Sequence, residues 1–211
     1  MPNWCYTNIT IFHYDEEKLK KFFKQIDEWS KKTYAKNGFD CEGAGCRWLG
    51  NIVGNAGLAT WKSRGDKGED FEPYIRCRGT LNDLYLNGNN IELHTETAWV
   101  PMMQMWQELV DKYLPDADIW YTADESGCGL YVTNDPDLIG KYNIDLWDIP
   151  DKFIKETSEY EATENYTIKF LQRVLETDES DIDKLLSMYE DMDDPWFSVH
   201  KWEQCDISEC E

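Results

Sequence analysis

Polar and apolar residues alternate through the first twelve positions, the pattern of a strand with one buried side. Cys5, Thr7, Ile9 and Ile11 fall on one face, and Tyr6, Asn8, Thr10 and Phe12 fall on the other. A secretory signal has an uninterrupted apolar core, which the polar residues break here. We therefore expect a strand over residues 4–12 and a folded domain that begins close to Met1.

A helical spacing of apolar residues follows twice. Over residues 15–32 the apolar positions are Leu19, Phe22, Phe23, Ile26 and Trp29, and three acids occupy the first turn, where the helix dipole favours them. A second stripe follows Pro101, which suits a first helical turn because its missing N–H has no partner there. Its members are Met102, Met105, Trp106, Leu109, Val110 and Tyr113.

Two hairpins are predicted between and after these helices. The segment TLNDLYLNGNNIELHTETAW has two alternating runs around Asn87-Gly88, a dipeptide typical of tight hairpin turns. Residues 119–123 and 130–133 form a second pair that turns through Glu125-Ser126-Gly127. Short strands are expected near residues 48–53 and 74–77. This order of elements predicts an α+β fold with one helical layer on a mostly antiparallel sheet.

Beyond residue 134 the composition changes. A helix is predicted over residues 161–176, a second one begins at Ser180 or Asp181, and alternation over residues 196–202 indicates a closing strand. We expect residues 1–134 to form the main domain. Residues 135–211 are expected to form an acidic, mainly helical extension with that closing strand.

The net charge of the chain narrows the classes of partner that it can be expected to bind. The 211 residues carry a formal charge of −21, and residues 135–211 hold 22 Asp and Glu against 7 Lys and Arg, a net charge of −15. Such a surface repels nucleic acid and anionic lipid and attracts basic protein surfaces. No apolar run approaches eighteen residues, so neither direct nucleic-acid binding nor a membrane-spanning segment is expected.

The seven cysteines are odd in number and scattered, which fits the reducing cytoplasm of a host cell. Two pairs, Cys41 with Cys46 and Cys205 with Cys210, have a spacing wider than that of common zinc sites. A composite zinc site would need one of the isolated histidines His13, His94 and His200. Whether these residues bind zinc stays open, and no metal site is predicted.

Catalytic motifs are missing from the sequence: it has no paired histidines of a zinc protease, no serine elbow and no phosphate-binding glycine loop. We therefore expect a protein that is not an enzyme, with no catalytic residues and no cofactor. The alternative is a small metal-dependent enzyme. Its carboxylates would be Glu92, Glu96, Asp124 and Glu125, converging at one edge of the sheet on a hard divalent ion.

Two segments carry a family resemblance: MPNWCYTNITI at the start, and TETAWVPMMQMWQELVDKYLPDADIWYTADESGCGLYV. Together they resemble the YubB-like ferredoxin-like domain family of phage and plasmid proteins, a family of largely unknown function. The matching residues are Pro2, Asn3, Trp4, Cys5, Asn8, Thr97, Ala98, Trp99, Pro101, Glu125 and Gly127. This chain departs from the family at Met102, where a second proline is usual, and in the midway segment, where only ATWKS remains. The resemblance implies a ferredoxin-like fold and a mobile-element origin.

Acidic residues near the end of the chain form the predicted partner-binding site. They are Glu176, Asp178, Glu179, Asp181, Asp183, Glu190, Asp191, Asp193 and Asp194, with Trp196 and Trp202 as aromatic anchors. Carboxylates flanked by aromatic rings imitate a phosphate backbone with adjacent bases. The hypothesis is a phage or mobile-element inhibitor, a nucleic-acid mimic of the anti-CRISPR kind, that binds the basic surface of a host nucleic-acid-handling protein. Besides the metal enzyme, a ferredoxin-like module that binds nucleic acid through sheet aromatics remains an alternative.

Overall fold

The computed structural model describes residues 3–34, 47–58 and 75–210. The chain has a mixed α+β architecture whose strands are mostly antiparallel, as the sequence predicts. It divides into two compact units, Met1–Leu130 together with Cys205–Glu211, and Tyr131–Gln204. The last seven residues thus belong to the first unit, although the sequence analysis placed them with the acidic extension.

Four strands of a six-stranded sheet lie within the first unit: β1 (Trp4–Phe12), β2 (Gly79–Asn87), β3 (Asn90–Ala98) and β4 (Asp118–Glu125). Their order is β2-β3-β1-β4, and every neighbouring pair is antiparallel. The first strand in the sequence is therefore central in this sheet. Strand β1 pairs along its full length with β3, from Trp4 opposite Ala98 to Phe12 opposite Asn90.

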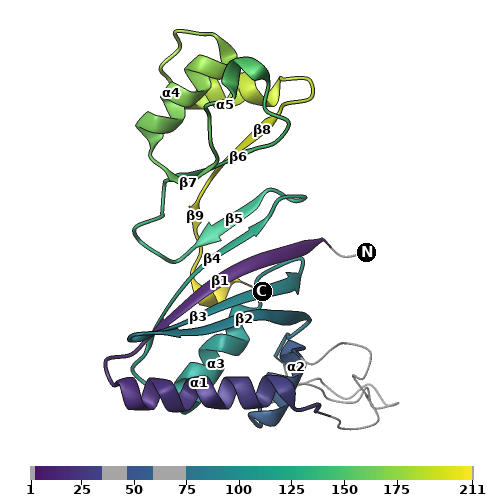
Figure 1. Cartoon of the computed structure of the whole chain (residues 1–211), viewed down its shortest axis with the longest axis vertical. Coiled ribbons are helices and arrows are strands. Elements are labelled where there is room, and N and C mark those ends of the chain that lie inside the picture. The colour runs from purple at the N-terminus through teal and green to yellow at the C-terminus, as the bar shows by residue number, and fades with distance from the viewer. Residues whose placement is uncertain (1–2, 35–46, 59–74, 211) are drawn as a thin grey trace. The chain divides into compact units, whose positions relative to one another are not determined.

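Two amphipathic helices, α1 (Glu16–Lys31) and α3 (Met103–Tyr113), lie on one face of this sheet (Figure 1). Asp15 caps α1, because its side chain accepts hydrogen bonds from the backbone N–H groups of Glu17 and Lys18. The buried face of α1 consists of Leu19, Phe22, Ile26 and Ser30. The predicted inner face of β1 is confirmed, since Cys5, Thr7, Ile9 and Ile11 are all buried.

The predicted strand near residues 48–53 is wrong, because residues 49–53 lie in a short helix, α2 (Leu49–Asn55), and Trp48 before it forms an isolated bridge with Thr80. Glycines allow this helix to pack closely: a Cβ at Gly50 would overlap the Trp48 ring, and one at Gly54 would overlap the Tyr34 ring. The apolar residues Leu49, Ile52 and Val53 have helical spacing, which the surrounding glycines obscured in the sequence. The strand expected over residues 74–77 is not observed at 75–77, and residue 74 is outside the described residues.

The first predicted hairpin is confirmed with a two-residue turn. Strand β2 ends at Asn87 and β3 begins at Asn90, and Gly88 has a φ of 56°, a conformation that glycine adopts readily. The second predicted hairpin corresponds to β4 and β5 (Leu130–Thr133), and β4 extends through Glu125. Both turns thus lie where the turn-forming residues of the sequence place them.

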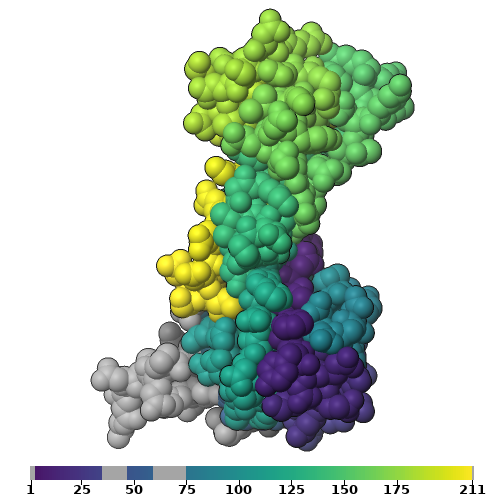
Figure 2. Space-filling view, turned by 90° about the vertical axis from the view of Figure 1, so that its left-hand side faces the viewer, coloured from purple at the N-terminus to yellow at the C-terminus, as the bar shows by residue number. Residues whose placement is uncertain are grey.

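The end of the chain packs on β4 of the first unit. The Tyr121 hydroxyl donates to the carbonyl of Cys205 at 2.7 Å and lies 2.6 Å from the Cys210 sulfur. A short 3-10 helix, η2 (Ile207–Glu209), connects the two cysteines, whose sulfurs are 2.6 Å apart. Figure 2 shows the last residues in yellow at the surface of the molecule.

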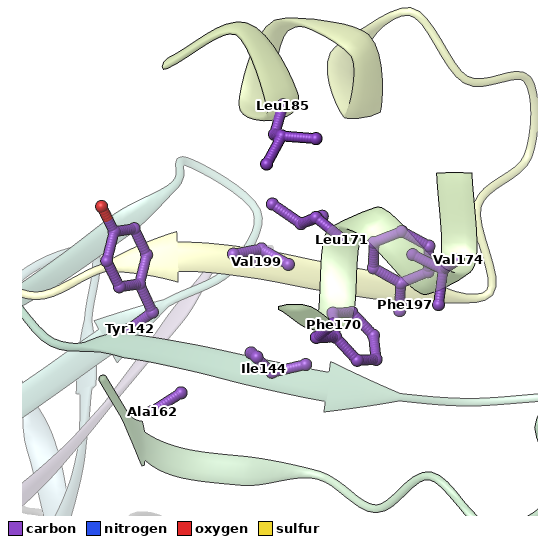
Figure 3. Close-up of a cluster of buried hydrophobic side chains, with 9 residues drawn as sticks. All are labelled: Tyr142, Ile144, Ala162, Phe170, Leu171, Val174, Leu185, Phe197 and Val199. Atoms are coloured by element: carbon purple, nitrogen blue, oxygen red, sulfur yellow. The ribbon is translucent and has the colours of Figure 1, made fainter. Parts of the chain in front are cut away.

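The second unit has its own antiparallel sheet, of β6 (Tyr142–Leu146), β7 (Glu159–Ala162) and β8 (Phe197–Lys201) in the order β7-β6-β8. The helices α4 (Glu164–Leu175) and α5 (Ile182–Glu190) contribute to the same core, and a 3-10 turn, η1 (Asp151–Phe153), precedes β7. Strand β9 (Glu203–Gln204) pairs in parallel with β5. Figure 3 shows the core side chains Tyr142, Ile144, Ala162, Phe170, Leu171, Val174, Leu185, Phe197 and Val199 gathered between helices and strands.

This second unit corrects the expectation of a mainly helical extension. Both predicted helices and the closing strand are present, but β6 and β7 were not predicted. Strand β6 has the sequence YNIDL, in which Tyr142, Asn143 and Ile144 are all buried, so the strand lacks the alternation that marks a half-exposed strand. No helix in the described part of the chain is long and apolar enough to span a membrane.

Candidate functional site

The two segments that carry the family resemblance meet at one end of the first sheet. The start of β1 lies against the ends of β3 and β4, so that Cys5 is opposite Thr97 and Tyr6 is opposite Asp124. The backbone N–H of Trp99 donates to the carbonyl of Asn3 at 3.0 Å, with Trp99 in a left-handed conformation at a φ of 75°. Pro2, another of the matching residues, is outside the described residues.

Glu125 is the most deeply buried carboxylate at this end of the sheet, with 3% of its surface exposed. Its Oε1 accepts a hydrogen bond from the Gly127 backbone N–H at 2.9 Å. A Cβ at Gly127 would lie 2.8 Å from that oxygen and 2.7 Å from Asn3 Nδ2, so a larger residue here would have to displace these two side chains. Its Oε2 has no hydrogen-bond partner among the described residues.

Neither cysteine at this end of the sheet is an activated nucleophile. Burial, with smaller contributions from Asp124 and Glu125, raises the pKa of the Cys5 thiol to about 12. The hydrogen bond of Cys128 with Glu125 raises the pKa of that exposed thiol. Because the thiolate is the reactive form, both side chains are protonated and unreactive near neutral pH.

The four carboxylates of the metal-enzyme alternative do not converge. Glu92 and Glu96 are four residues apart along β3, a separation of roughly 13 Å. Asp124 and Glu96 lie on opposite sides of Tyr6, two strands apart. Glu125 follows Asp124 in β4 and is on the other face of the sheet. The hypothesised metal site is therefore not assembled.

The histidines and cysteines considered for zinc are separate from one another as well. His13 is fully buried and accepts from the backbone N–H of Asp15, whereas the exposed His94 pairs with Asp83 at 3.5 Å. His200 stacks on Tyr131 with the ring centroids 4.0 Å apart. Cys41 and Cys46 are outside the described residues. Within the described ranges, no three His, Cys, Asp or Glu side chains form a group suited to a metal ion.

Three of the predicted partner-binding acids have local structural roles. Asp181 caps α5 by accepting from the backbone N–H groups of Asp183 and Lys184. Backbone N–H groups of Asp181 and Ser180, and then the Lys184 ammonium, lower the pKa of Glu179. Glu176 pairs with the ammonium group of Lys152, which lowers the pKa of its carboxyl.

The other six acids are exposed, and none has an ion-pair partner in the described part of the chain. They are Asp178, Asp183, Glu190, Asp191, Asp193 and Asp194. The last four lie at the carboxyl end of α5 and in the turn that leads to β8. The second unit as a whole has 19 Asp and Glu against 7 Lys and Arg, a net charge of −12. These six carboxylates are available to a basic partner.

The structure places the two predicted aromatic anchors inside the second unit. Trp202 is 1% exposed, lies against the Tyr131 and Tyr160 rings, and donates from Nε1 to the Tyr160 carbonyl at 3.0 Å. It is therefore a core residue and not a surface anchor. Trp196 is half-buried and stacks on Phe153 with a centroid distance of 5.1 Å. Trp196 lies just before β8 and Trp202 just after it, and the alternation in the sequence did not show what covers either ring.

A further acidic surface emerges from the strand order of the first unit. We name it the outer sheet face, the side of β2-β3-β1-β4 opposite α1 and α3. Cross-strand pairing places sixteen residues on it in four rows: Thr80, Glu96, Tyr6 and Asp124; Asp83, His94, Asn8 and Thr122; Tyr85, Glu92, Thr10 and Trp120; Asn87, Asn90, Phe12 and Asp118. The sequence showed the alternation within each strand and the pairing of β2 with β3, but not that β1 lies between β3 and β4.

Comparisons of the chain with protein-family models, with curated proteins and with solved structures found no match.

Proposed function

We propose that this protein works by protein–protein interaction, with the acidic surface of its second unit binding the basic surface of a nucleic-acid-handling protein. The observation that carries this proposal is the set of six exposed carboxylates without ion-pair partners in the described residues, on a unit of net charge −12. The assignment as an inhibitor of a host defence effector, of the anti-CRISPR kind, rests on the resemblance to phage and plasmid proteins.

A ferredoxin-like fold for the first unit is part of the same proposal. Its support is the element order β1, α1, β2, β3, α3, β4 together with the strand order β2-β3-β1-β4. The short helix α2 is an addition between α1 and β2. This fold positions both resemblance segments at one end of the sheet but assigns them no chemistry.

Electrostatics explain why so many carboxylates remain unpaired. Like charges within one unit repel each other and destabilise the folded state, so a large negative charge is costly for solubility alone. A basic partner reverses this effect, because complementary potentials accelerate encounter and oppose partners of the wrong charge. The six side chains stand at the surface, where such attraction extends about one Debye length, roughly 10 Å at 0.1 M salt.

The test compares two charge-reversed forms of the full chain. Glu190→Lys/Asp191→Lys changes the acidic end of α5, where cations are favoured by the helix dipole, so the fold is expected to persist. The control Glu28→Lys/Glu108→Lys makes the same change in net charge on exposed positions of α1 and α3. Each immobilised chain is incubated with host-cell extract, and bound proteins are identified by mass spectrometry.

The unchanged chain and the control are expected to retain the same basic nucleic-acid-handling protein, and Glu190→Lys/Asp191→Lys is expected to lose it. Retention should also fall between about 0.1 M and 1 M salt, since the Debye length shortens from roughly 10 Å to 3 Å. A short DNA or RNA duplex should displace the chain from that partner. Equal retention by the two charge-reversed forms would contradict the proposal.

A further inference from the structure

The outer sheet face combines negative charge with exposed aromatic rings. Five of its sixteen residues are carboxylates, Asp83, Glu92, Glu96, Asp118 and Asp124, and none is Lys or Arg. The only basic group is the His94 imidazole, which pairs with Asp83. A ligand of this face must therefore bring positive charge.

Aromatic rings on the same face give it a second property. Tyr6 is 52% exposed and Tyr85 is 51% exposed, unusually high for large rings on a sheet. Phe12 and Trp120 are neighbours on the face, with ring centroids 6.2 Å apart. The Tyr85 hydroxyl donates to the Asp83 carboxylate at 3.1 Å, which holds that ring and raises its pKa.

The rows place carboxylates beside these rings. Tyr6 lies between Glu96 on β3 and Asp124 on β4, each about 5 Å away at the backbone. Tyr85 lies beside Glu92, whose Oε1 accepts from the side-chain amide of Asn87 at 3.1 Å. A planar cation lying on either ring would meet a carboxylate at its edge.

The arginine side chain has the chemistry that fits this arrangement. Its guanidinium group stacks on aromatic faces and pairs with carboxylates through two parallel N–H groups, whereas the compact lysine ammonium is more strongly hydrated. Nucleic acid would also stack on the rings, but its phosphates would meet five carboxylates and no Lys or Arg among the sixteen residues of the face, where the nearby Arg47 lies beside β2 and donates to the Asn82 carbonyl. A second copy of this face is disfavoured for the same electrostatic reason.

We propose that the outer sheet face is a docking surface for an extended, arginine-rich segment of a partner protein. The segment lies across β3 and β1, with guanidinium groups on Tyr6 and Tyr85 and paired with Glu92 and Glu96. This surface consists of first-unit residues only, so it shares no residue with the acidic surface of the second unit, and the proposal does not depend on that surface.

The test measures binding of a fluorescently labelled nona-arginine peptide to the full chain by fluorescence anisotropy. The variant Glu92→Gln/Glu96→Gln removes two carboxylates from the face, and Glu28→Gln/Glu108→Gln removes two exposed carboxylates from the helices as a control of equal net charge. The face variant is expected to weaken binding about tenfold and the control less than about twofold. Equal weakening by the two variants would overturn the proposal.

A second pair of variants examines the rings. Tyr6→Ser removes a ring from the face, and Tyr14→Ser removes a ring that is 67% exposed outside the sheet. Tyr6→Ser is expected to weaken nona-arginine binding at least threefold and to reduce the preference for nona-arginine over nona-lysine, while Tyr14→Ser leaves both unchanged. Tyr85→Ser provides an independent variant on the edge strand, with the same expectation. If both Tyr6→Ser and Tyr85→Ser kept the full preference for nona-arginine over nona-lysine, the guanidinium groups would not stack on these rings and the proposal would be contradicted.

A labelled single-stranded RNA of equal length is the final comparison. We expect the chain to bind it far more weakly than nona-arginine at the same salt concentration. Stronger binding of the RNA, lost in Tyr6→Ser, would make this face a nucleic-acid surface and overturn the proposal. The Glu190→Lys/Asp191→Lys variant leaves the face intact. Adding Glu92→Gln/Glu96→Gln to that variant is therefore expected to weaken nona-arginine binding about tenfold, as it does in the unchanged chain.

Discussion

Replacing Trp202 distinguishes a core residue from a surface anchor. The ring is 1% exposed, contacts the Tyr131 and Tyr160 rings, and donates one hydrogen bond to the Tyr160 carbonyl at 3.0 Å. Trp202→Ala leaves a cavity in the second unit, and comparable substitutions lower the free energy of unfolding by about 3–5 kcal/mol. Trp202→Phe keeps most of the ring volume but loses the hydrogen bond, so a loss of about 1–2 kcal/mol is expected.

The assay must resolve the two units, since they can unfold in separate steps. Urea unfolding followed by circular dichroism gives the overall stability, and native-state hydrogen exchange of the β6 and β8 amides reports the second unit by itself. The control Trp147→Ala removes a ring that is 45% exposed in the same unit and is expected to change stability by less than about 0.5 kcal/mol. If the β8 amides of Trp202→Ala exchanged their hydrogens at the same rate as those of the unchanged chain, the ring would not stabilise the second unit. The inference from its burial would then be wrong.

Three further predictions concern other positions. The Cys205 and Cys210 sulfurs are 2.6 Å apart, so oxidised glutathione should convert the two thiols to a disulfide, with loss of two protons and two electrons to the oxidant. Peptide mapping under non-reducing conditions should find this pair. The rate of oxidation should rise with pH, because burial raises the pKa of Cys210 to about 12 and the thiolate is the reactive form. Burial lowers the pKa of His200 in the folded chain, so the unfolded chain binds the proton more tightly. The second unit should therefore lose stability as the pH falls below about 6.5. Thermal unfolding of His200→Gln should depend less on pH than that of the unchanged chain. Asp181→Ala removes the cap of α5 and should cost about 1 kcal/mol in urea unfolding, whereas Asp193→Ala, at an exposed position, should leave stability nearly unchanged.

Prediction from sequence succeeded where a local pattern has one physical cause. The alternation in residues 4–12, the apolar stripes of α1 and α3, and the Asn-Gly turn each correspond to an observed element. It failed at α2, where Gly50 packs beneath the ring of the adjacent Trp48 and Gly54 packs beneath the ring of Tyr34, and at β6, where consecutive residues are buried. In both places contacts made after folding override the local pattern.

For the candidate surfaces, too, some features could be predicted from the sequence and others depended on tertiary contacts. Sequence alone identified the acidic run, but three of its members, Glu176, Glu179 and Asp181, are engaged in local caps, turns or ion pairs. Trp202 is buried because the Tyr131 and Tyr160 rings lie against it, and these contacts cannot be read from the alternation of residues 196–202. The outer sheet face was missed because its residues come from three segments that are distant in the sequence: β1, the β2–β3 hairpin and β4.

The sequence by itself determined the types of most elements, the inward side of β1, and the concentration of negative charge in the last third, because periodicity and composition are local properties of the chain. Only the tertiary structure decided that β1 is central, that Tyr6 lies between Glu96 and Asp124, and that Trp202 is buried. Strand pairing joins residues up to about 120 positions apart in this sheet. Which strands pair depends on the burial of whole faces together, and no single segment contains that information.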